Sequence, residues 1–276
     1  MKGSRTGRNV IKQRILTGLI ALPLLILFIW FASPLFFQAL IWVVGGIGLW
    51  EFVRMTLPEE REMVRRLATA GGVLLLILFC RQDFLLAMGG MTGLFLAFAI
   101  WFLFRFRDLE TVMQHHALVF LGYLYVGGLL AHLVFLRELP LGREWIYLTL
   151  LVTMSSDTLA YFVGRFLGRR KLYPAISPNK SIEGALGGLA GAVGGALIAK
   201  AWFMPGLGIL ACLVLGVLLG SLAQVGDLFE SMLKRGFKVK DSGGIIPGHG
   251  GILDRLDSLL FVFPPAYYYA LYFPAG

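Results

Sequence analysis

The amino-acid sequence predicts an all-α, polytopic integral membrane protein with about nine transmembrane helices in a single domain, residues 1–276. The chain is 58% hydrophobic, with a mean hydropathy of +0.78, whereas soluble domains are nearer to about 45–50% apolar. Its hydrophobic residues form long runs, most of them close to the roughly 20 residues that a helix needs to cross a bilayer. Short charged segments separate these runs.

The N-terminal part, residues 1–136, is expected to form a scaffold of five spans. Its first 14 residues are basic and precede an apolar run over 15–31. That run is longer than a signal-peptide core of about 7–15 residues, so we interpret it as an uncleaved span. Further spans are expected at 35–53, 67–80, 84–104 and 112–136. The run at 67–80 is short for a complete crossing.

The C-terminal part, residues 145–276, is expected to carry four more spans and the active site. These spans are expected at 145–164, 182–203, 206–229 and 252–272. Glycines recur at four-residue spacing in the second of them, at Gly184, Gly187, Gly188, Gly191 and Gly195. Such spacing lets helices approach closely in lipid. No GK[ST] follows these glycines, so they are expected to pack helices rather than bind phosphate.

The distribution of positive charge predicts the orientation of the chain, because cytoplasmic loops carry an excess of Lys and Arg. Nine spans and a cytoplasmic N-terminus place every Lys and Arg in a cytoplasmic segment except Arg81, Arg137, Arg143 and Lys200. The net charge of +9 is therefore explained by topology. We expect the lipid bilayer as a partner and no nucleic acid.

Residues 226–258 form a polar, glycine-rich segment between two apolar runs: GDLFESMLKRGFKVKDSGGIIPGHGGILDRLDS. A charged side chain costs about 2.5–3.5 kcal/mol at mid-bilayer on insertion scales, so charges placed in and beside spans indicate function. The predicted topology opens this segment to the cytoplasm, together with the basic loop 165–180. Asp157 lies inside the preceding span. The sequence therefore predicts a pocket lined by carboxylates and cations at the inner membrane surface.

Helical spacing groups the polar side chains of this region, because residues three or four apart share a face. The groups are Asp227, Glu230, Ser231 and Lys234; Asp254, Asp257 and Ser258; and Asp157, Tyr161 and Arg165. Carboxylates without a His or Cys cluster suit a hard cation, so Mg²⁺ is expected rather than Zn²⁺. The number of metal sites, and whether a monovalent cation joins them, is left open. The segment SGGIIPGHGG is expected to offer backbone N–H groups to a polyphosphate.

Such parts indicate phosphoryl or nucleotidyl transfer, in which catalysis is mostly positioning and charge neutralisation. A lipid phosphate monoester is largely dianionic at neutral pH, since its second pKa is about 6. It can attack without a general base, which weakens the case for His249 as one.

Segment 226–258 closely resembles the signature of bacterial phosphatidate cytidylyltransferases, also called CDP-diacylglycerol synthases. The matching positions are Gly226, Asp227, Ser231, Lys234, Arg235, Lys240, Asp241, the PGHGG at 247–251, Asp254, Arg255 and Asp257. Two further segments are similar to the same family, SSDTLAYFVGRFLG at 155–168 and SPNKSIEG at 177–184. The first five spans resemble it only in hydropathy.

The resemblance implies a Mg²⁺-dependent enzyme that condenses CTP with phosphatidic acid to give CDP-diacylglycerol and pyrophosphate. It implies a homodimer in the bacterial inner membrane with its active site facing the cytoplasm. The implied metal ligands are Asp157, Asp227 and Asp254, and the implied catalytic residues are Lys234, Arg235, Lys240, Asp241, His249 and Asp257. The implied substrate-binding residues are Ser177, Lys180, Ser181, Glu183, Ser231, Gly248, Gly250, Gly251 and Arg255.

Two other functions remain open. A CTP-dependent lipid or prenol kinase would use similar parts but would release CDP instead of pyrophosphate. A secondary transporter for an anionic solute would also place charges within spans. Transporters usually show inverted repeats and helices broken near mid-bilayer, and neither feature is visible in this sequence.

Overall fold

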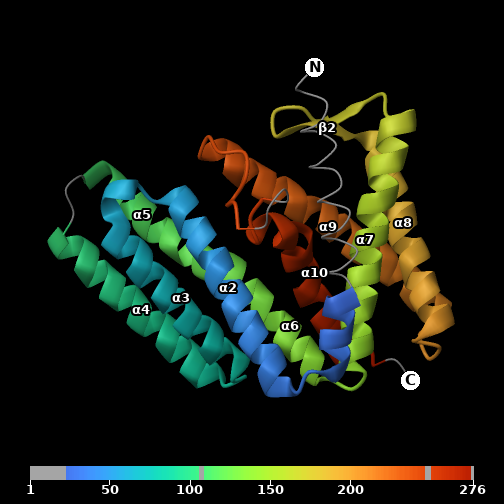
Figure 1. The fold of residues 1–276 in the computed structure, drawn as a ribbon, viewed down its shortest axis with the longest axis horizontal. Helices are drawn as coiled ribbons and strands as arrows, with labels where there is room; N and C mark the ends of the chain where they lie inside the picture. Colours follow the sequence, from blue (N-terminus) through green and yellow to red (C-terminus); the bar gives the residue numbers. More distant parts are fainter. Residues whose placement is uncertain (1–22, 106–108, 246–249, 275–276) are drawn as a thin grey trace.

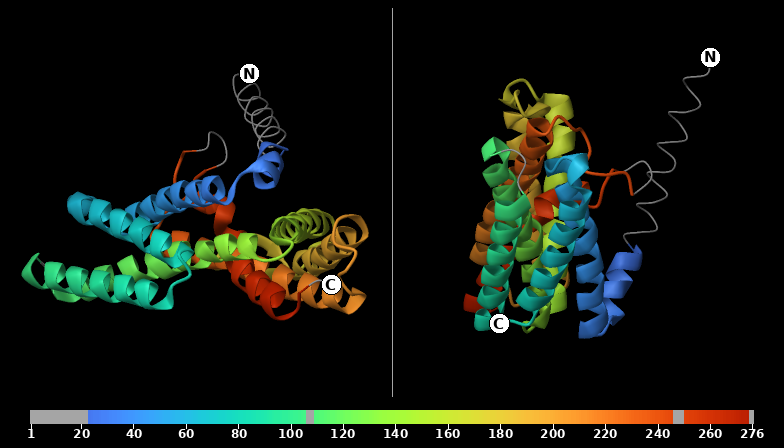
Figure 2. Two further views of the ribbon diagram at one scale, coloured as in Figure 1. Left: turned by 90° about the horizontal axis from the view of Figure 1, so that it is seen from below. Right: turned by 90° about the vertical axis from the view of Figure 1, so that its left-hand side faces the viewer.

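A computed structural model describes residues 23–105, 109–245 and 250–274. Long helices form the body of the molecule (Figures 1 and 2). In chain order they are α2 (Pro34–Thr56), α3 (Glu62–Cys80), α4 (Phe84–Arg105), α5 (Leu109–Gly122), α6 (Leu129–Glu138), α7 (Gly142–Leu167), α8 (Ile182–Trp202), α9 (Ile209–Gly236) and α10 (Leu253–Tyr272). In the view of Figure 1, α2, α3 and α4 are inclined to the nearly upright α7.

Within the described ranges, seven helices are long and apolar enough to cross a membrane. They are α2, α3, α4, the continuous helix Glu110–Glu138, α7, α8 and α9. The short third run is extended at its start, since α3 begins at Glu62 and has 19 residues. The helix α10 forms where the last span was predicted but is not one of the seven. Residues 15–22 of the first predicted span lie outside the described residues, whereas its remaining part, 23–31, is helical. The all-α membrane class is confirmed, whereas the count of nine is not.

The continuous helix of the scaffold contains a π-helical segment, Tyr123–Gly128, between α5 and α6. This segment was not predicted, and π-helical turns are often found at functional sites. It presents the buried ring of Tyr125, whose centroid lies 5.1 Å from that of Phe229 on α9 and 6.3 Å from that of Phe261 on α10. The scaffold therefore packs directly against the two helices that carry the polar segment.

The prediction of a loop at the basic segment 165–180 is wrong. Its first residues complete α7, and the rest form an antiparallel hairpin of β1 (Lys171–Tyr173) and β2 (Ser177–Ser181). The hairpin lies at the end of the bundle where α9 also ends (Figure 1). Two side chains fix the ends of the hairpin. Glu183 accepts hydrogen bonds from the backbone N–H groups of Arg169 and Arg170, just before β1. Ser181, the last residue of β2, is the N-cap of α8.

The glycines of α8 pack the helix closely against α7, as their spacing predicts (Figure 1). A Cβ atom added at Gly191 would clash with the carbonyl oxygen of Ser155, and one added at Gly187 would lie 2.6 Å from Val163. Only glycine permits backbones to approach this closely. This contact holds Asp157, on α7, close to the start of α8.

We expect Gly191→Leu to lower the melting temperature of the protein in detergent, because overpacking a tight interface costs about 1–3 kcal/mol. Gly194→Leu, on the same helix, is the matched control, since nothing lies within 4 Å of a Cβ at that position. Thermal unfolding followed by size-exclusion chromatography measures both variants. Equal melting temperatures would show that the α7–α8 contact is not set by Gly191.

Candidate functional site

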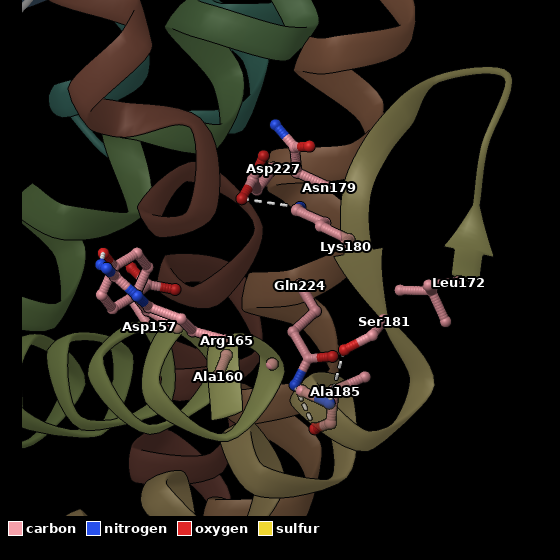
Figure 3. A pocket seen from close by; sticks show the side chains of 13 residues that line it. Asp157, Ala160, Arg165, Leu172, Asn179, Lys180, Ser181, Ala185, Gln224 and Asp227 are labelled. Atoms are coloured by element: carbon pink, nitrogen blue, oxygen red, sulfur yellow. Dashed lines mark hydrogen bonds and ion pairs between the residues drawn. The ribbon is translucent and has the colours of Figure 1, made fainter. Parts of the chain in front are cut away.

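A cavity of about 490 Å³ lies where α7, the hairpin, α8 and α9 meet (Figure 3). Its polar lining comes from all of these elements except α8, whose first residues contribute small side chains. The lining includes Asp157, Tyr161 and Arg165 of α7, Asn179, Lys180 and Ser181 of β2, and Gln224 and Asp227 of α9. The three sequence segments singled out above therefore contribute to one cavity.

One ion pair joins β2 to α9 across this cavity. The Nζ atom of Lys180 lies 2.7 Å from Oδ2 of Asp227, as Figure 3 shows. Ser231, one turn further along α9, donates a hydrogen bond to Oδ1 of the same carboxylate at 3.4 Å. Asp227 is half-buried, so its charge is partly shielded from solvent and Lys180 is its principal counter-charge.

Two further carboxylates, those of Asp157 and Asp257, interact with the Asp227 carboxylate of this ion pair. Gly226 lets α9 lie against α10, because a Cβ there would sit 2.5 Å from the carbonyl oxygen of Asp257. Asp157 interacts electrostatically with Asp227 and Asp257. Among the described residues, no three or more His, Cys, Asp or Glu side chains are already assembled as a metal site. A pair of carboxylates suffices for Mg²⁺, which usually completes its shell with water and substrate phosphates.

A second buried ionic cluster lies at the cavity-side end of α9. The Nζ atom of Lys234 donates to Oε2 of Glu230 at 3.1 Å and to Oδ1 of Asp254 at 2.7 Å. The side chain of Glu230 is fully buried and that of Asp254 is 8% exposed. Glu230 was not among the predicted site residues, although its four-residue spacing from Lys234 was visible in the sequence. Lys234 is thus fixed between two carboxylates.

Asp254 also anchors the connection between α9 and α10. Its Oδ2 atom accepts hydrogen bonds from the backbone N–H groups of Ser242, at 3.0 Å, and Gly251, at 2.8 Å. The N–H group of Gly251 was expected to form part of an open anion-binding nest. That expectation is wrong for Gly251, because the carboxylate of Asp254 already accepts its hydrogen bond. The role of Asp254 as a metal ligand stays a prediction.

Glu51 is a site residue that the sequence reasoning missed. It lies on α2 with 3% of its surface exposed. Its carboxylate accepts hydrogen bonds from Ser242 Oγ at 3.1 Å, Ile252 N at 3.1 Å and Leu253 N at 2.9 Å. The only signal in the sequence was a lone carboxylate inside the apolar run 35–53.

Three of the predicted substrate-binding residues have structural contacts in the hairpin. Ser177 lies on β2 opposite Tyr173. Ser181 accepts a hydrogen bond from Gly184 N at 3.1 Å as the N-cap of α8. Glu183 holds the backbone at the end of α7. These contacts position Lys180, and the binding roles of the three residues stay predictions.

The remaining predicted residues lie near the α9–α10 connection. Arg235, Lys240, Asp241 and Arg255 are exposed, and Gly250 has a φ of +83°. Gly248 and His249 lie outside the described residues. Asp241 lines a second cavity, of about 390 Å³, which it shares with Glu51.

Comparison with known proteins shows the family to which the chain is related. A model of the cytidylyltransferase family matches residues 12–273. The chain belongs to the cytidylyltransferase family. Membership identifies it as an enzyme of the nucleotidyltransferase class and confirms the resemblance seen in the sequence. The motifs alone indicated a relationship over the C-terminal part. The family match also covers the scaffold, so the relationship extends over nearly the whole chain.

Individual relatives support the same relationship. The chain is similar to the phosphatidate cytidylyltransferase of Bacillus subtilis (strain 168), with 37% identity over 263 residues, covering 93% of this chain and 96% of the relative. It is 40% identical over 161 residues to that of Staphylococcus epidermidis (strain ATCC 12228 / FDA PCI 1200), covering 58% of each chain. The phosphatidate cytidylyltransferase of Brucella abortus (strain 2308) is 44% identical over 147 residues, covering 50% of this chain and 52% of the relative.

Proposed function

We propose that the protein is a CTP:phosphatidate cytidylyltransferase of phospholipid biosynthesis. In the proposed reaction a phosphate oxygen of phosphatidic acid forms a bond to the α-phosphorus of CTP. The bond from that phosphorus to the bridging β-phosphate oxygen breaks, and pyrophosphate leaves with the electron pair. The products are CDP-diacylglycerol and pyrophosphate. The names of the relatives support this choice of substrates.

The observation that carries the proposal is the contact between Lys180 and Asp227, 2.7 Å long. It unites two segments, separated by the whole of α8, in a cavity whose walls are membrane-spanning helices. A lipid phosphate can approach such a cavity from the bilayer, while a nucleotide approaches from the aqueous side. Charges concentrated at one end of the helices fit this arrangement better than a transport path through mid-bilayer.

The residues fit Mg²⁺ by the chemistry of their donors. Asp157 and Asp227 are carboxylates that line one cavity, and Mg²⁺ takes one or two protein carboxylates together with phosphate oxygens. We propose that these two residues hold it, with Asp257 beside them. When bound, Mg²⁺ neutralises negative charge on the phosphates of CTP.

The remaining negative charge of the phosphates is proposed to be neutralised by cationic side chains of the protein. Lys180 and Arg165 line the cavity and supply positive charge to the phosphates, which a lysine does as a point charge and an arginine as a bidentate donor. Lys234, held on two sides by Glu230 and Asp254, cannot reorient freely. It therefore offers a preorganised charge to the leaving pyrophosphate.

We further propose that the enzyme lies in the bacterial inner membrane with this cavity facing the cytoplasm, and that it works as a homodimer. The orientation is supported by the excess of Lys and Arg in the segments at the same end as the hairpin. The membrane assignment draws on the bacterial relatives. The homodimer rests on the family resemblance.

Product analysis tests the proposed reaction. Purified protein is incubated with CTP, phosphatidic acid and Mg²⁺, and released pyrophosphate and CDP are quantified separately. We expect pyrophosphate equimolar with CDP-diacylglycerol. Release of CDP would support a CTP-dependent lipid kinase instead, and absence of nucleotide turnover would contradict both enzyme assignments.

Gly250→Ala is expected to lower kcat roughly tenfold, because a left-handed backbone at a non-glycine residue stores strain and a Cβ there would lie 2.5 Å from Oδ2 of Asp254. Gly244→Ala is the matched control, because nothing lies within 4 Å of a Cβ at that position. Steady-state rates of the two variants provide the measurement. Wild-type turnover by Gly250→Ala would show that Asp254 tolerates displacement.

A further inference from the structure

Glu51 connects the scaffold to both ends of the segment that joins α9 to α10. At the first end it accepts a hydrogen bond from the hydroxyl of Ser242, and at the second end it accepts from the backbone of Ile252 and Leu253. Negative charge at the start of α10 is also favoured by the helix dipole. One buried carboxylate therefore binds both the side chain of Ser242 and the backbone of Ile252 and Leu253, on the two sides of the connection.

The surrounding backbone is shaped to admit this carboxylate. A Cβ atom at Gly243 would clash with Oε1 of Glu51, and one at Gly251 would clash with both Oε2 of Glu51 and Oγ of Ser242. The two glycines flank the carboxylate from opposite ends of the connection. Glu51 is thus tightly enclosed, which limits the positions that Gly243 and Gly251 can take.

The same contacts lead to the proposed reaction site through two further residues. Ser242 and Gly251 donate their N–H groups to Asp254, and Asp254 accepts a hydrogen bond from Lys234 at 2.7 Å. We propose that Glu51 is a positioning residue for nucleotidyl transfer, which fixes the start of α10 so that Asp254 holds Lys234 in place. This inference rests on the proposed function, since it needs Lys234 to act on the phosphates.

Isosteric and truncated variants separate positioning from folding. Glu51→Gln keeps the shape of the side chain, but only one of its two terminal atoms, the amide oxygen, can accept hydrogen bonds. We expect its kcat to fall about tenfold, with the KM for CTP nearly unchanged, as for a group that acts in the transition state. Met55→Ala is the control, because Met55 lines the same cavity of about 390 Å³ and has no hydrogen bond to the connection.

Glu51→Ala adds a test by chemical rescue. The truncated side chain opens space beside the cavity of about 390 Å³, into which acetate fits. We expect acetate at about 100 mM to raise the kcat of Glu51→Ala about fivefold or more. Acetamide, which has the same shape, is expected to have no effect, because only a carboxylate accepts hydrogen bonds from all of the donors that Glu51 leaves behind. Acetate is not expected to alter the wild type or Met55→Ala.

The outcomes are distinguishable. Full activity of Glu51→Gln would overturn the inference. So would a loss of kcat in Glu51→Ala that acetate does not restore and that accompanies a lower melting temperature of that variant. Inactivity of the wild type would instead count against the proposed function. Reduced kcat in Glu51→Gln at an unchanged melting temperature, together with rescue by acetate alone, supports the positioning role.

Discussion

Asp227→Asn is expected to reduce cytidylyl transfer by about a hundredfold or more, the size of effect seen when a group that organises transition-state charge is removed. Asparagine preserves the size of the side chain but removes the charge that faces Lys180 at 2.7 Å. It also removes one of the two carboxylates proposed to hold Mg²⁺. Initial rates with saturating CTP and phosphatidic acid measure the loss.

The control for this variant is Asp83→Asn, the same chemical change at the start of α4. Asp83 accepts a hydrogen bond from the backbone N–H of Leu86 at 3.0 Å, and asparagine caps a helix about as well as aspartate. We expect this variant to keep wild-type activity. Comparable rates for Asp227→Asn and the wild type would contradict the assignment of Asp227 to the site.

Lys234→Met is expected to destabilise the protein as well as inactivate it. The change leaves Glu230, which is fully buried, and Asp254, which is 8% exposed, without the cation that lies between them. Removing one partner of a buried ionic cluster costs about 3–5 kcal/mol, because it leaves an uncompensated charge. A clear fall in melting temperature in detergent is therefore expected.

Arg235→Met is the control for stability, because Arg235 is the next residue along α9 and its side chain is exposed. Its melting temperature is expected to match the wild type. Adding Glu230→Gln to Lys234→Met removes one of the two stranded charges and is expected to recover part of the lost stability. A Lys234→Met protein that melts with the wild type would show that the cluster is not a folding determinant.

The membrane class and the positions of the helices were predictable because hydrophobic length and charge distribution are properties of local sequence. The hairpin at 171–181 was not, because its strands are short and are held by capping contacts from Glu183 and Ser181. The π-helical segment at 123–128 carries no compositional signal that separates it from an α-helix.

The polar side chains of the site were predictable from their concentration and their helical spacing, but their partners were not. The pairing of Lys180 with Asp227 spans α8 and required the packing of α7, α8 and α9. Glu51 was missed because its three hydrogen-bond donors lie about 200 residues away in sequence. Spacing within one helix reveals neighbours on that helix, whereas contacts of this range arise only from the tertiary fold.

The most direct test of nucleotidyl transfer at this site follows the cytosine ring of CTP into lipid. Purified wild type and Asp227→Asn are incubated with phosphatidic acid, Mg²⁺ and CTP labelled either on cytosine or on the γ-phosphate, and chloroform-extractable label is counted. We expect the wild type to transfer the cytosine label and not the γ-phosphate label, and Asp227→Asn to transfer neither. Incorporation from the γ-phosphate alone, or no incorporation by the folded wild type, would contradict nucleotidyl transfer at this site.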